Sequence, residues 1–274
     1  MKERVTLTIE ADLLKNIDEM VDYTHVKNRS HAVELLLIKG LGHRKPRKAV
    51  ILSGGTLVKF NNEMIPKTMI QAKHKPLLEY NIELLKKYDI KDIFIIVGEG
   101  SEKIKQYFGS GLDYGVKITY LEEGHPLGTA GALSLAKPYL TETFILCNGD
   151  ELKNININDM YNFHNTNGGM TTIALTTLED PSNYGVALLN GNKITAFVEK
   201  PAKNNPISNL INAGLYIMDP EVLNLIPEGF AMLEQDVFPK LANEDKLMGY
   251  VFGGQWFDSD PARLKRAEKN WKEF

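Results

Sequence analysis

From Lys48 to Asp150 the chain alternates short, continuously apolar runs with segments of helical periodicity. The apolar runs are residues 49–52, 93–97 and 144–147, residues 116–121 form a further predicted strand, and helical patterns at 77–88, 102–108 and 129–140 separate these segments. Continuously apolar strands are buried on both faces, which is typical of parallel strands joined by helical crossovers. The pattern therefore predicts an α/β domain with a mainly parallel sheet and helices on both faces.

The second half of the chain has a different pattern. Residues 184–189 and 193–198 flank Asn190-Gly191-Asn192, a favourable turn for a β-hairpin, and residues 212–218 form another predicted strand. We expect this antiparallel material to form a lid beside the Rossmann-like, mixed sheet. Ligands of such sheets bind outside the carboxyl ends of the strands, which is where Ser53-Gly54-Gly55 and Asp150 fall.

The first 42 residues predict a separate small domain. Alternating residues from Arg4 to Ile9 indicate a strand, Leu13 to Val21 have helical spacing, and Asn28 can cap a second helix. One strand and two helices cannot bury a sufficient core alone, so this piece must pair with another surface. Residues 43–48 are basic, contain proline and are interpreted as a linker, which leaves residues 49–274 for the main domain.

The strand, the Leu13-Leu14 helix and the Asn28-Arg29-Ser30 helix entry resemble the ribbon-helix-helix family of DNA-binding proteins, CopG-like repressors in particular. The resemblance implies a homodimer or higher even oligomer on operator DNA. The side chains placed on base edges would be those of Arg4, Thr6 and Thr8, and the phosphate contacts would come from Asn28, Arg29 and Ser30. A domain that serves only for oligomerisation, with solvated threonines, is the alternative.

Charge and cysteine content narrow the classes of protein. The formal net charge is −3, which does not indicate a general affinity for nucleic acid or membranes. Residues 1–48 nevertheless carry ten Lys/Arg against seven Asp/Glu, which favours an anionic partner for this segment. Cys147 is the only cysteine, so no internal disulfide can form, and no apolar run has the length of a membrane span. A cytoplasmic protein is expected.

Three groups of residues indicate phosphate and metal chemistry. Gly54-Gly55 would let backbone N–H groups approach phosphate oxygens, and Lys67, after Pro66, would neutralise a phosphate. Asp150 and Asp258 are carboxylates that would hold Mg²⁺ if they converge, since this ion binds few protein oxygens. Each motif alone has an ordinary alternative: a tight turn, a solvated lysine, or a turn residue before a proline.

Together, and in this order, the motifs resemble the sugar-1-phosphate nucleotidyltransferases, the nucleotide-sugar pyrophosphorylases. The resemblance covers residues 48–274. The segments that carry it are residues 49–55, Pro66-Lys67, residues 75–80, residues 126–131, Asn148-Gly149-Asp150, residues 197–201, residues 212–216 and Trp256-Phe257-Asp258.

The resemblance implies a reaction and a site. A sugar-1-phosphate oxygen attacks the α-phosphorus of a nucleoside triphosphate, and pyrophosphate leaves. It places the nucleotide at Ser53, Gly54, Gly55, Glu123, Gly128 and Thr129, phosphate at Lys67, the sugar phosphate at Gly185, Glu199, Lys200 and Asn212, and Mg²⁺ at Asp150 and Asp258. The 126–131 run with Glu123 is more similar to guanylyl or uridylyl members of the family than to thymidylyl ones.

The first loop departs from the family pattern. Gly54-Gly55 is followed by Thr56-Leu57-Val58-Lys59-Phe60, where the family has a third glycine and a Gly-Thr-Arg unit. Lys59 is the candidate to replace the missing arginine as a catalytic cation, although it lacks the bidentate fork. Two hypotheses follow: an active transferase that also binds DNA or dimerises, and a weakly active or inactive transferase domain that senses nucleotides or nucleotide sugars for a ribbon-helix-helix regulator.

Overall fold

The computed structural model describes residues 5–23, 26–41, 45–202 and 206–272. The chain divides into two compact units, Met1–Lys45 and Pro46–Phe274. In these described ranges no helix combines the length and the apolar character needed to cross a membrane. The two units are considered separately below, and the larger one contains the sheet and the candidate site.

The first unit contains two helices, α1 (Ala11–Glu19) and α2 (Arg29–Leu41). Ile17 and Ala32 are buried in it, whereas Val5 and Leu7 are 72% and 56% exposed. The strand predicted over residues 4–9 is not formed in residues 5–9 of the single chain. A lone strand has no hydrogen-bonding partner, so its backbone cannot form a ladder.

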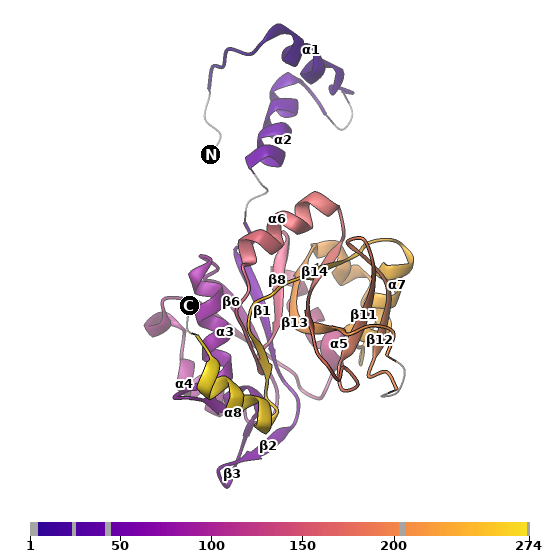
Figure 1. Ribbon diagram of the computed structural model, residues 1–274. Coiled ribbons are helices and arrows are strands. Elements are labelled where there is room, and N and C mark those ends of the chain that lie inside the picture. The colour runs from indigo at the N-terminus through magenta and orange to yellow at the C-terminus, as the bar shows by residue number, and fades with distance from the viewer. Residues whose placement is uncertain (1–4, 24–25, 42–44, 203–205, 273–274) are drawn as a thin grey trace. The chain divides into compact units, whose positions relative to one another are not determined.

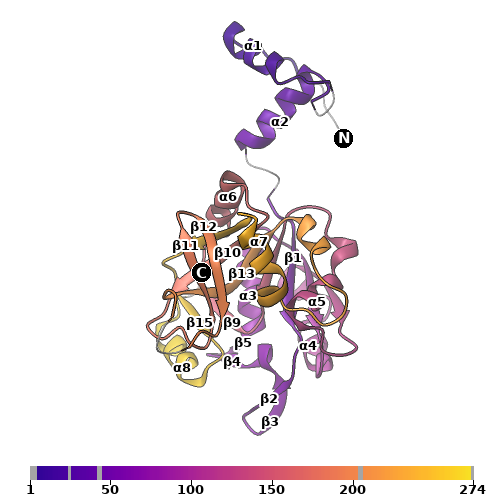
Figure 2. The same ribbon diagram turned by 90° about the vertical axis from the view of Figure 1, so that its right-hand side faces the viewer.

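The second unit is built on one nine-stranded sheet with the order β10-β14-β12-β11-β13-β8-β1-β6-β7. Figures 1 and 2 show this sheet at the centre of the unit. Its strands are β1 (Lys48–Ser53), β6 (Asp92–Val97), β7 (Lys117–Glu122), β8 (Phe144–Asn148), β10 (Thr171–Thr177), β11 (Gly185–Asn190), β12 (Lys193–Glu199), β13 (Leu210–Met218) and β14 (Leu247–Val251).

Parallel and antiparallel strands meet between β8 and β13. The strands β8, β1, β6 and β7 pair in parallel, while β13 pairs with β8 in the antiparallel direction. The predicted mixed α/β fold is confirmed, with one correction. The antiparallel strands extend the same sheet instead of forming a separate lid, because the apolar β13 is buried and pairs edge to edge with β8.

Helices cover both faces of the sheet, as predicted. The apolar side chains of α3 (Leu77–Lys87), α4 (Ser101–Phe108) and α6 (Ile157–Asn167) join one core cluster with alternate residues of β1 and β6. Those of α5 (Gly128–Ser134) and α7 (Phe238–Asn243) join a second cluster on the other face. Helix α5 is shorter than the predicted 129–140 helix: it ends at Ser134, and Pro138 has no backbone N–H to donate to the Ser134 carbonyl, so a separate turn follows at Lys137–Tyr139.

Three two-stranded sheets and one helix complete the unit. They are β2 (Leu57–Phe60) with β3 (Glu63–Pro66), β4 (Gln71–Ala72) with β5 (Lys75–Pro76), β9 (Glu151–Lys153) with β15 (Trp256–Asp258), and α8 (Pro261–Asn270). Short helical turns lie at Lys67–Met69, Leu112–Tyr114, Lys137–Tyr139, Pro220–Asn224 and Leu233–Val237. A third core cluster, which includes Leu77, Leu264 and Trp271, packs α8 beside α3.

Candidate active site

A pocket of about 340 Å³ opens at the carboxyl ends of β1, β6 and β8. This is the position at which the sequence predicted a ligand. Sixteen residues line the pocket: Leu52, Gly54, Gly55, Lys67, Thr68, Ile96, Glu123, Pro126, Leu127, Gly128, Thr129, Ala132, Asn148, Asp150, Phe230 and Met232. The structure therefore brings together seven of the predicted site residues, namely Gly54, Gly55, Lys67, Glu123, Gly128, Thr129 and Asp150.

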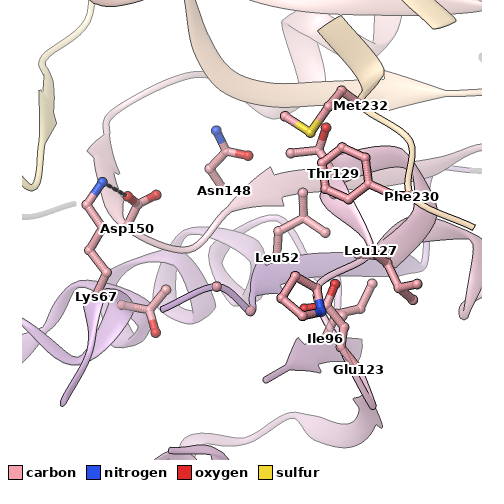
Figure 3. A pocket seen from close by; sticks show the side chains of 16 residues that line it. Leu52, Lys67, Ile96, Glu123, Leu127, Thr129, Asn148, Asp150, Phe230 and Met232 are labelled. Atoms are coloured by element: carbon pink, nitrogen blue, oxygen red, sulfur yellow. Dashed lines mark ion pairs between the residues drawn. The ribbon is translucent and has the colours of Figure 1, made fainter. Parts of the chain in front are cut away.

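The two ends of the pocket differ in chemistry. Figure 3 shows Lys67 and Asp150 at one end, and Leu127, Phe230 and Glu123 at the other. Leu52 lies between the two ends in the same view. An elongated pocket with a charged end and a mostly apolar end has the polarity of a nucleotide, whose phosphates are charged and whose base is flat and apolar on its faces.

At the charged end, Lys67 Nζ lies 2.7 Å from Asp150 Oδ2. Burial by itself would lower the pKa of Lys67, but the Asp150 carboxylate and, more weakly, Asp258 outweigh it and raise the pKa. Lys67 is therefore a stable cation beside the pocket. Its side chain is still about half exposed, so it can reach a phosphate that enters the site.

Asp258 does not line the pocket, but strand pairing holds it near this end. In the β9–β15 ladder Asp258 lies opposite Glu151, the residue after Asp150. The Tyr184 hydroxyl donates a hydrogen bond to the Asp258 carboxylate, and Arg263 Nε lies 3.6 Å from its other oxygen. Burial and then the Asp258 charge raise the pKa of Tyr184, so this hydroxyl remains a donor. Asp258 and the residue next to Asp150 are thus held on adjacent strands, although the two aspartates are more than a hundred residues apart in the chain.

The two carboxylates fit a magnesium ion by their chemistry. Mg²⁺ takes oxygen ligands and commonly binds one or two protein carboxylates together with substrate phosphates. The Lys67 ammonium beside Asp150 shows that a positive charge is favoured at this position. Among the residues that the structure describes, no group of three or more His, Cys, Asp and Glu side chains is assembled for a metal. The remaining ligands of an ion here would have to come from a bound nucleotide and water.

Glycines at the end of β1 make room for Glu123. A Cβ on Gly54 would lie 2.3 Å from Glu123 Oε2, and Gly55 has a φ of +93°, which favours glycine. The carboxylate therefore packs directly on the glycine turn. Burial raises the pKa of Glu123, and a hydrogen bond with the Leu127 backbone partly opposes that rise.

The glycines at the start of α5 have a packing role. A Cβ on Gly128 would lie 2.4 Å from the Ala231 carbonyl oxygen, and one on Gly131 would lie 2.4 Å from that of Gly229. The Ala231 carbonyl accepts hydrogen bonds from the N–H groups of Ala130 and Gly131, at 2.9 and 3.1 Å. The small residues therefore allow close packing of α5 against residues 229–232, and Gly128 also lines the pocket.

This same segment supplies site residues that the sequence reasoning missed. Phe230, which is 67% exposed, and Met232 line the pocket beside α5. Thr129 Oγ1 donates to Glu234 Oε2 at 2.7 Å and accepts a hydrogen bond from the Leu233 N–H at 2.8 Å. Burial raises the pKa of Glu234. No local spacing could have found these residues, because their partners lie about a hundred positions earlier in the chain.

The predicted sugar-phosphate residues form a second group outside the lining of the pocket. A Cβ on Gly185 would lie 2.9 Å from Glu199 Oε2, and Lys200 Nζ lies 3.7 Å from Glu199 Oε1. Asn212 Nδ2 donates to the hydroxyl of Tyr216 at 2.8 Å. Burial raises the pKa of Glu199, although Lys200 opposes the rise. Burial, and to a lesser extent the charges of Glu234 and Glu199, raise the pKa of Tyr216, so this group lies near the Glu234–Thr129 contact.

Lys59 and Ser53, which were predicted to lie at the nucleotide and its phosphates, are also outside the lining of the pocket. Lys59 is exposed on β2, opposite Met64 of β3, in a hairpin that projects from the sheet in Figures 1 and 2. Lys59 therefore does not line the pocket, and its replacement of a phosphate-clamping arginine stays a prediction. The apolar residues of the shortened loop explain the hairpin, since Val58 and Phe60 pack against the third core cluster. Ser53 is buried below the pocket and hydrogen bonds Thr68 at 2.6 Å.

The residues of the first unit that were predicted to contact DNA differ in exposure and in their hydrogen-bond partners. Arg4 lies outside the described residues, and Thr6, Thr8 and Ser30 are exposed. Asn28 caps α2 by accepting a hydrogen bond from the His31 N–H at 2.9 Å, as predicted. Arg29 is not free, because its Nε and Nη2 each lie 2.6 Å from a carboxylate oxygen of Asp18.

A family model described as "Nucleotidyl transferase" matches residues 48–259. The chain belongs to the nucleotidyl transferase family. The match begins with β1 and ends one residue after Asp258, so it includes both carboxylates and the whole pocket. The first unit of this nucleotidyl transferase lies outside the match.

Mannose-1-phosphate guanylyltransferases are among the proteins to which the chain is similar. The chain is 36% identical over 219 residues to the mannose-1-phosphate guanylyltransferase catalytic subunit beta of Danio rerio, and 35% identical over 223 residues to the mannose-1-phosphate guanyltransferase of Saccharomyces cerevisiae. Each alignment covers 77% of this chain and 60% of the relative. This nucleotidyl transferase thus spans about three fifths of the length of these relatives.

Solved structures share the fold. A structure titled as a putative glucose-1-phosphate thymidylyltransferase from Bacillus anthracis, in complex with sucrose, has a TM-score of 0.73 at 26% identity. The alignment covers 81% of this chain and 94% of that chain. HddC from Yersinia pseudotuberculosis complexed with GMP-PN has a TM-score of 0.69 at 22% identity and covers 82% of this chain and all of its own. Both likenesses show that the fold of this nucleotidyl transferase is shared with these structures.

Proposed function

We propose that the second unit transfers a nucleotidyl group from a nucleoside triphosphate to a sugar-1-phosphate. A sugar-phosphate oxygen attacks the α-phosphorus, the new phosphorus–oxygen bond forms, the bond to the β-phosphate oxygen breaks, and pyrophosphate leaves. The observation that supports this most directly is the Lys67–Asp150 ion pair at one end of the pocket, with Asp258 held opposite Glu151 close enough to raise the pKa of Lys67. The attacking phosphate oxygen is already anionic, so the protein needs no general base.

The roles of the side chains follow from their positions. Lys67 offsets negative charge on the triphosphate, and its ion pair with Asp150 holds it in place before substrate binds. Asp150 and Asp258 would bind Mg²⁺, which supplies a positive charge that polarises the α-phosphate. Glu199, Lys200 and Asn212 would hold the sugar phosphate in the second group of residues. In this arrangement catalysis comes from alignment and charge, with little covalent chemistry by the protein.

Guanine is the base that best matches the apolar end of the pocket. Its Watson–Crick edge presents two adjacent N–H donors, and a carboxylate such as Glu123 can accept both. Uracil presents one donor between two carbonyl oxygens, which a carboxylate would repel. The names of the relatives agree with GTP and mannose-1-phosphate as the first substrate pair.

The test is a substrate panel with the full chain. Purified protein with Mg²⁺ is incubated with each pair of a nucleoside triphosphate and a hexose-1-phosphate, and pyrophosphate release is measured. We expect the fastest release with GTP and mannose-1-phosphate, and none with Asp150→Ala. No release with any pair, together with tight binding of a nucleotide sugar, would instead favour the sensor hypothesis.

We further infer that the first unit pairs with a second copy of this chain. Val5, Leu7 and Leu13 are more than half exposed there, and a two-helix unit has too little core to stand alone. Light scattering of the full chain should show an even oligomer that Leu7→Lys weakens. A monomer would contradict this proposal.

We also propose that the same unit binds operator DNA. Thr6 and Thr8 are exposed and available, whereas Asn28 and Arg29 already have partners in the unit. We expect salt-dependent binding to a palindromic duplex from near the protein's own gene, weakened by Arg4→Ala. Absence of such binding by the wild type would leave dimerisation as the role of residues 1–42.

A further inference from the structure

A buried lysine lies directly behind the charged end of the pocket. The side chain of Lys153, on β9, is 1% exposed. Its Nζ donates to the carbonyl oxygens of Asn148 and Gly214, at 3.0 and 3.1 Å, and to Asn81 Oδ1 at 3.3 Å. The carboxylate of Glu151 is 3.5 Å away. A buried ammonium is costly unless all its donors are used, and here three acceptors and a counter-charge surround it.

Glu151 connects further parts of the chain to the same point. Its carboxylate accepts hydrogen bonds from Asn148 Nδ2 and Trp256 Nε1, both at 3.0 Å. It also packs on Gly214, where a Cβ would lie 2.4 Å from one carboxylate oxygen and where φ is +58°. The pair of Lys153 and Glu151 thus contacts the ends of β8 and β15 and the middle of β13.

Asn81, on α3, clamps the backbone on both sides of Asp150. Its Nδ2 donates to the carbonyl oxygens of Gly149 and Glu151, at 3.3 and 2.9 Å, while its Oδ1 faces Lys153. The residues on either side of Asp150 are therefore both held by hydrogen bonds from the Asn81 side-chain amide. The other carboxylate, Asp258, lies opposite Glu151 in the β9–β15 ladder.

We propose that Lys153 and Glu151 are positioning residues that set the relative placement of Asp150 and Asp258 and join this carboxylate pair to β13, the strand that carries Asn212. Neither residue lines the pocket, so they act through the backbone and side chains they hold. The inference rests on the proposed function only in treating the two aspartates as a metal site. Losing such supporting contacts typically weakens metal binding or activity by about 10- to 100-fold.

The experiment measures metal affinity and kinetics on the full chain. Mn²⁺ alone is titrated into the wild type and into Lys153→Met, and the free ion is followed by electron paramagnetic resonance. We expect Mn²⁺ to bind at least about tenfold more weakly to the variant. In the pyrophosphate assay, we expect kcat to fall by a similar factor while KM for the nucleotide changes little, since the base binds at the other end of the pocket.

Two further variants separate positioning from stability. Glu151→Gln/Lys153→Met removes both charges, so it leaves no unpaired buried ion if the single variant fails to fold. Thr172→Val removes a buried 2.8 Å hydrogen bond to His164 on another part of the sheet. It should lower the melting temperature without weakening Mn²⁺ binding.

Clear outcomes would overturn the inference. If Lys153→Met or the double variant binds Mn²⁺ as the wild type does and loses only stability, like Thr172→Val, then the pair is purely structural. A wild type that does not bind Mn²⁺ would also overturn it. Absence of pyrophosphate release by the wild type would refute the proposed function alone, because the Mn²⁺ affinities of the variants would still decide whether Lys153 and Glu151 position the carboxylates.

Discussion

The two ends of the pocket are built in different ways. At the charged end each side chain has a fixed partner, such as Lys67 with Asp150 at 2.7 Å and Asp258 with Tyr184. At the other end Phe230 is 67% exposed and belongs to a segment that reaches the pocket from far along the chain. Groups that offset charge during the reaction must be placed before it begins, whereas a flat base can be held by shape and contact area. The difference predicts effects on kcat at one end and on KM at the other.

Asp150→Asn should have the largest effect. The amide keeps the shape but removes a negative charge that would hold Mg²⁺ and that pairs with Lys67. We expect kcat to fall by on the order of 10³-fold, with little change in nucleotide affinity. Pyrophosphate release and GDP calorimetry measure the two quantities, and Asp245→Asn, at a remote surface pair with Lys193, is the control. Weaker GDP binding with unchanged kcat would contradict the predicted difference between the two ends of the pocket.

Lys67→Met should have the next largest effect on catalysis. It removes a cation that faces the pocket and leaves Asp150 without its ion pair. We expect kcat/KM to fall by about 10²-fold, which is typical for loss of one group that stabilises developing charge. Steady-state kinetics measure this, with Lys193→Met as the matched surface control. If Lys59→Met lowered kcat/KM as much, the hairpin would have to close over the pocket during the reaction.

Phe230→Ala tests the apolar end. Stacking of a base on an aromatic ring contributes about 1–3 kcal/mol, so KM for the nucleotide should rise about tenfold or more while kcat is retained. Phe230→Tyr keeps the ring and should restore the affinity. Kinetics and GDP calorimetry decide the result, and a fall in kcat without a change in KM would show that this segment helps align the phosphates instead.

Glu234→Gln should have the smallest effect, on stability alone. Burial raises the pKa of Glu234 above its ordinary value of 4.5, although the hydrogen bond from Thr129 opposes the rise. The folded chain therefore holds this proton more tightly than the unfolded chain, and stability falls as pH increases through the raised pKa. The variant should melt above the wild type at pH 7, and the difference should shrink as pH approaches 4.5. A difference independent of pH would indicate a packing effect.

Much of the large unit could be predicted from local patterns. The helix predicted at 77–88 is α3 at Leu77–Lys87, and the strand predicted at 93–97 is β6 at Asp92–Val97. Continuous apolar runs and turn residues are local signals, so they can be recognised without knowing which residues they contact in the folded chain. The limits of such signals appear at Val58 and Phe60. These residues lie where the family has its first loop, and they instead form a hairpin that packs against the third core cluster.

The sequence by itself determined the class of fold, the order of its motifs and the residue types at the charged end, because each depends on neighbours along the chain. Tertiary structure alone decided that Asp258 lies opposite Glu151, that the 229–232 segment covers the start of α5, and that Lys153 joins β8 to β13. These contacts link residues about 60 to 110 positions apart or involve a buried charge. Their geometry is set by strand register and packing, which local sequence patterns do not encode.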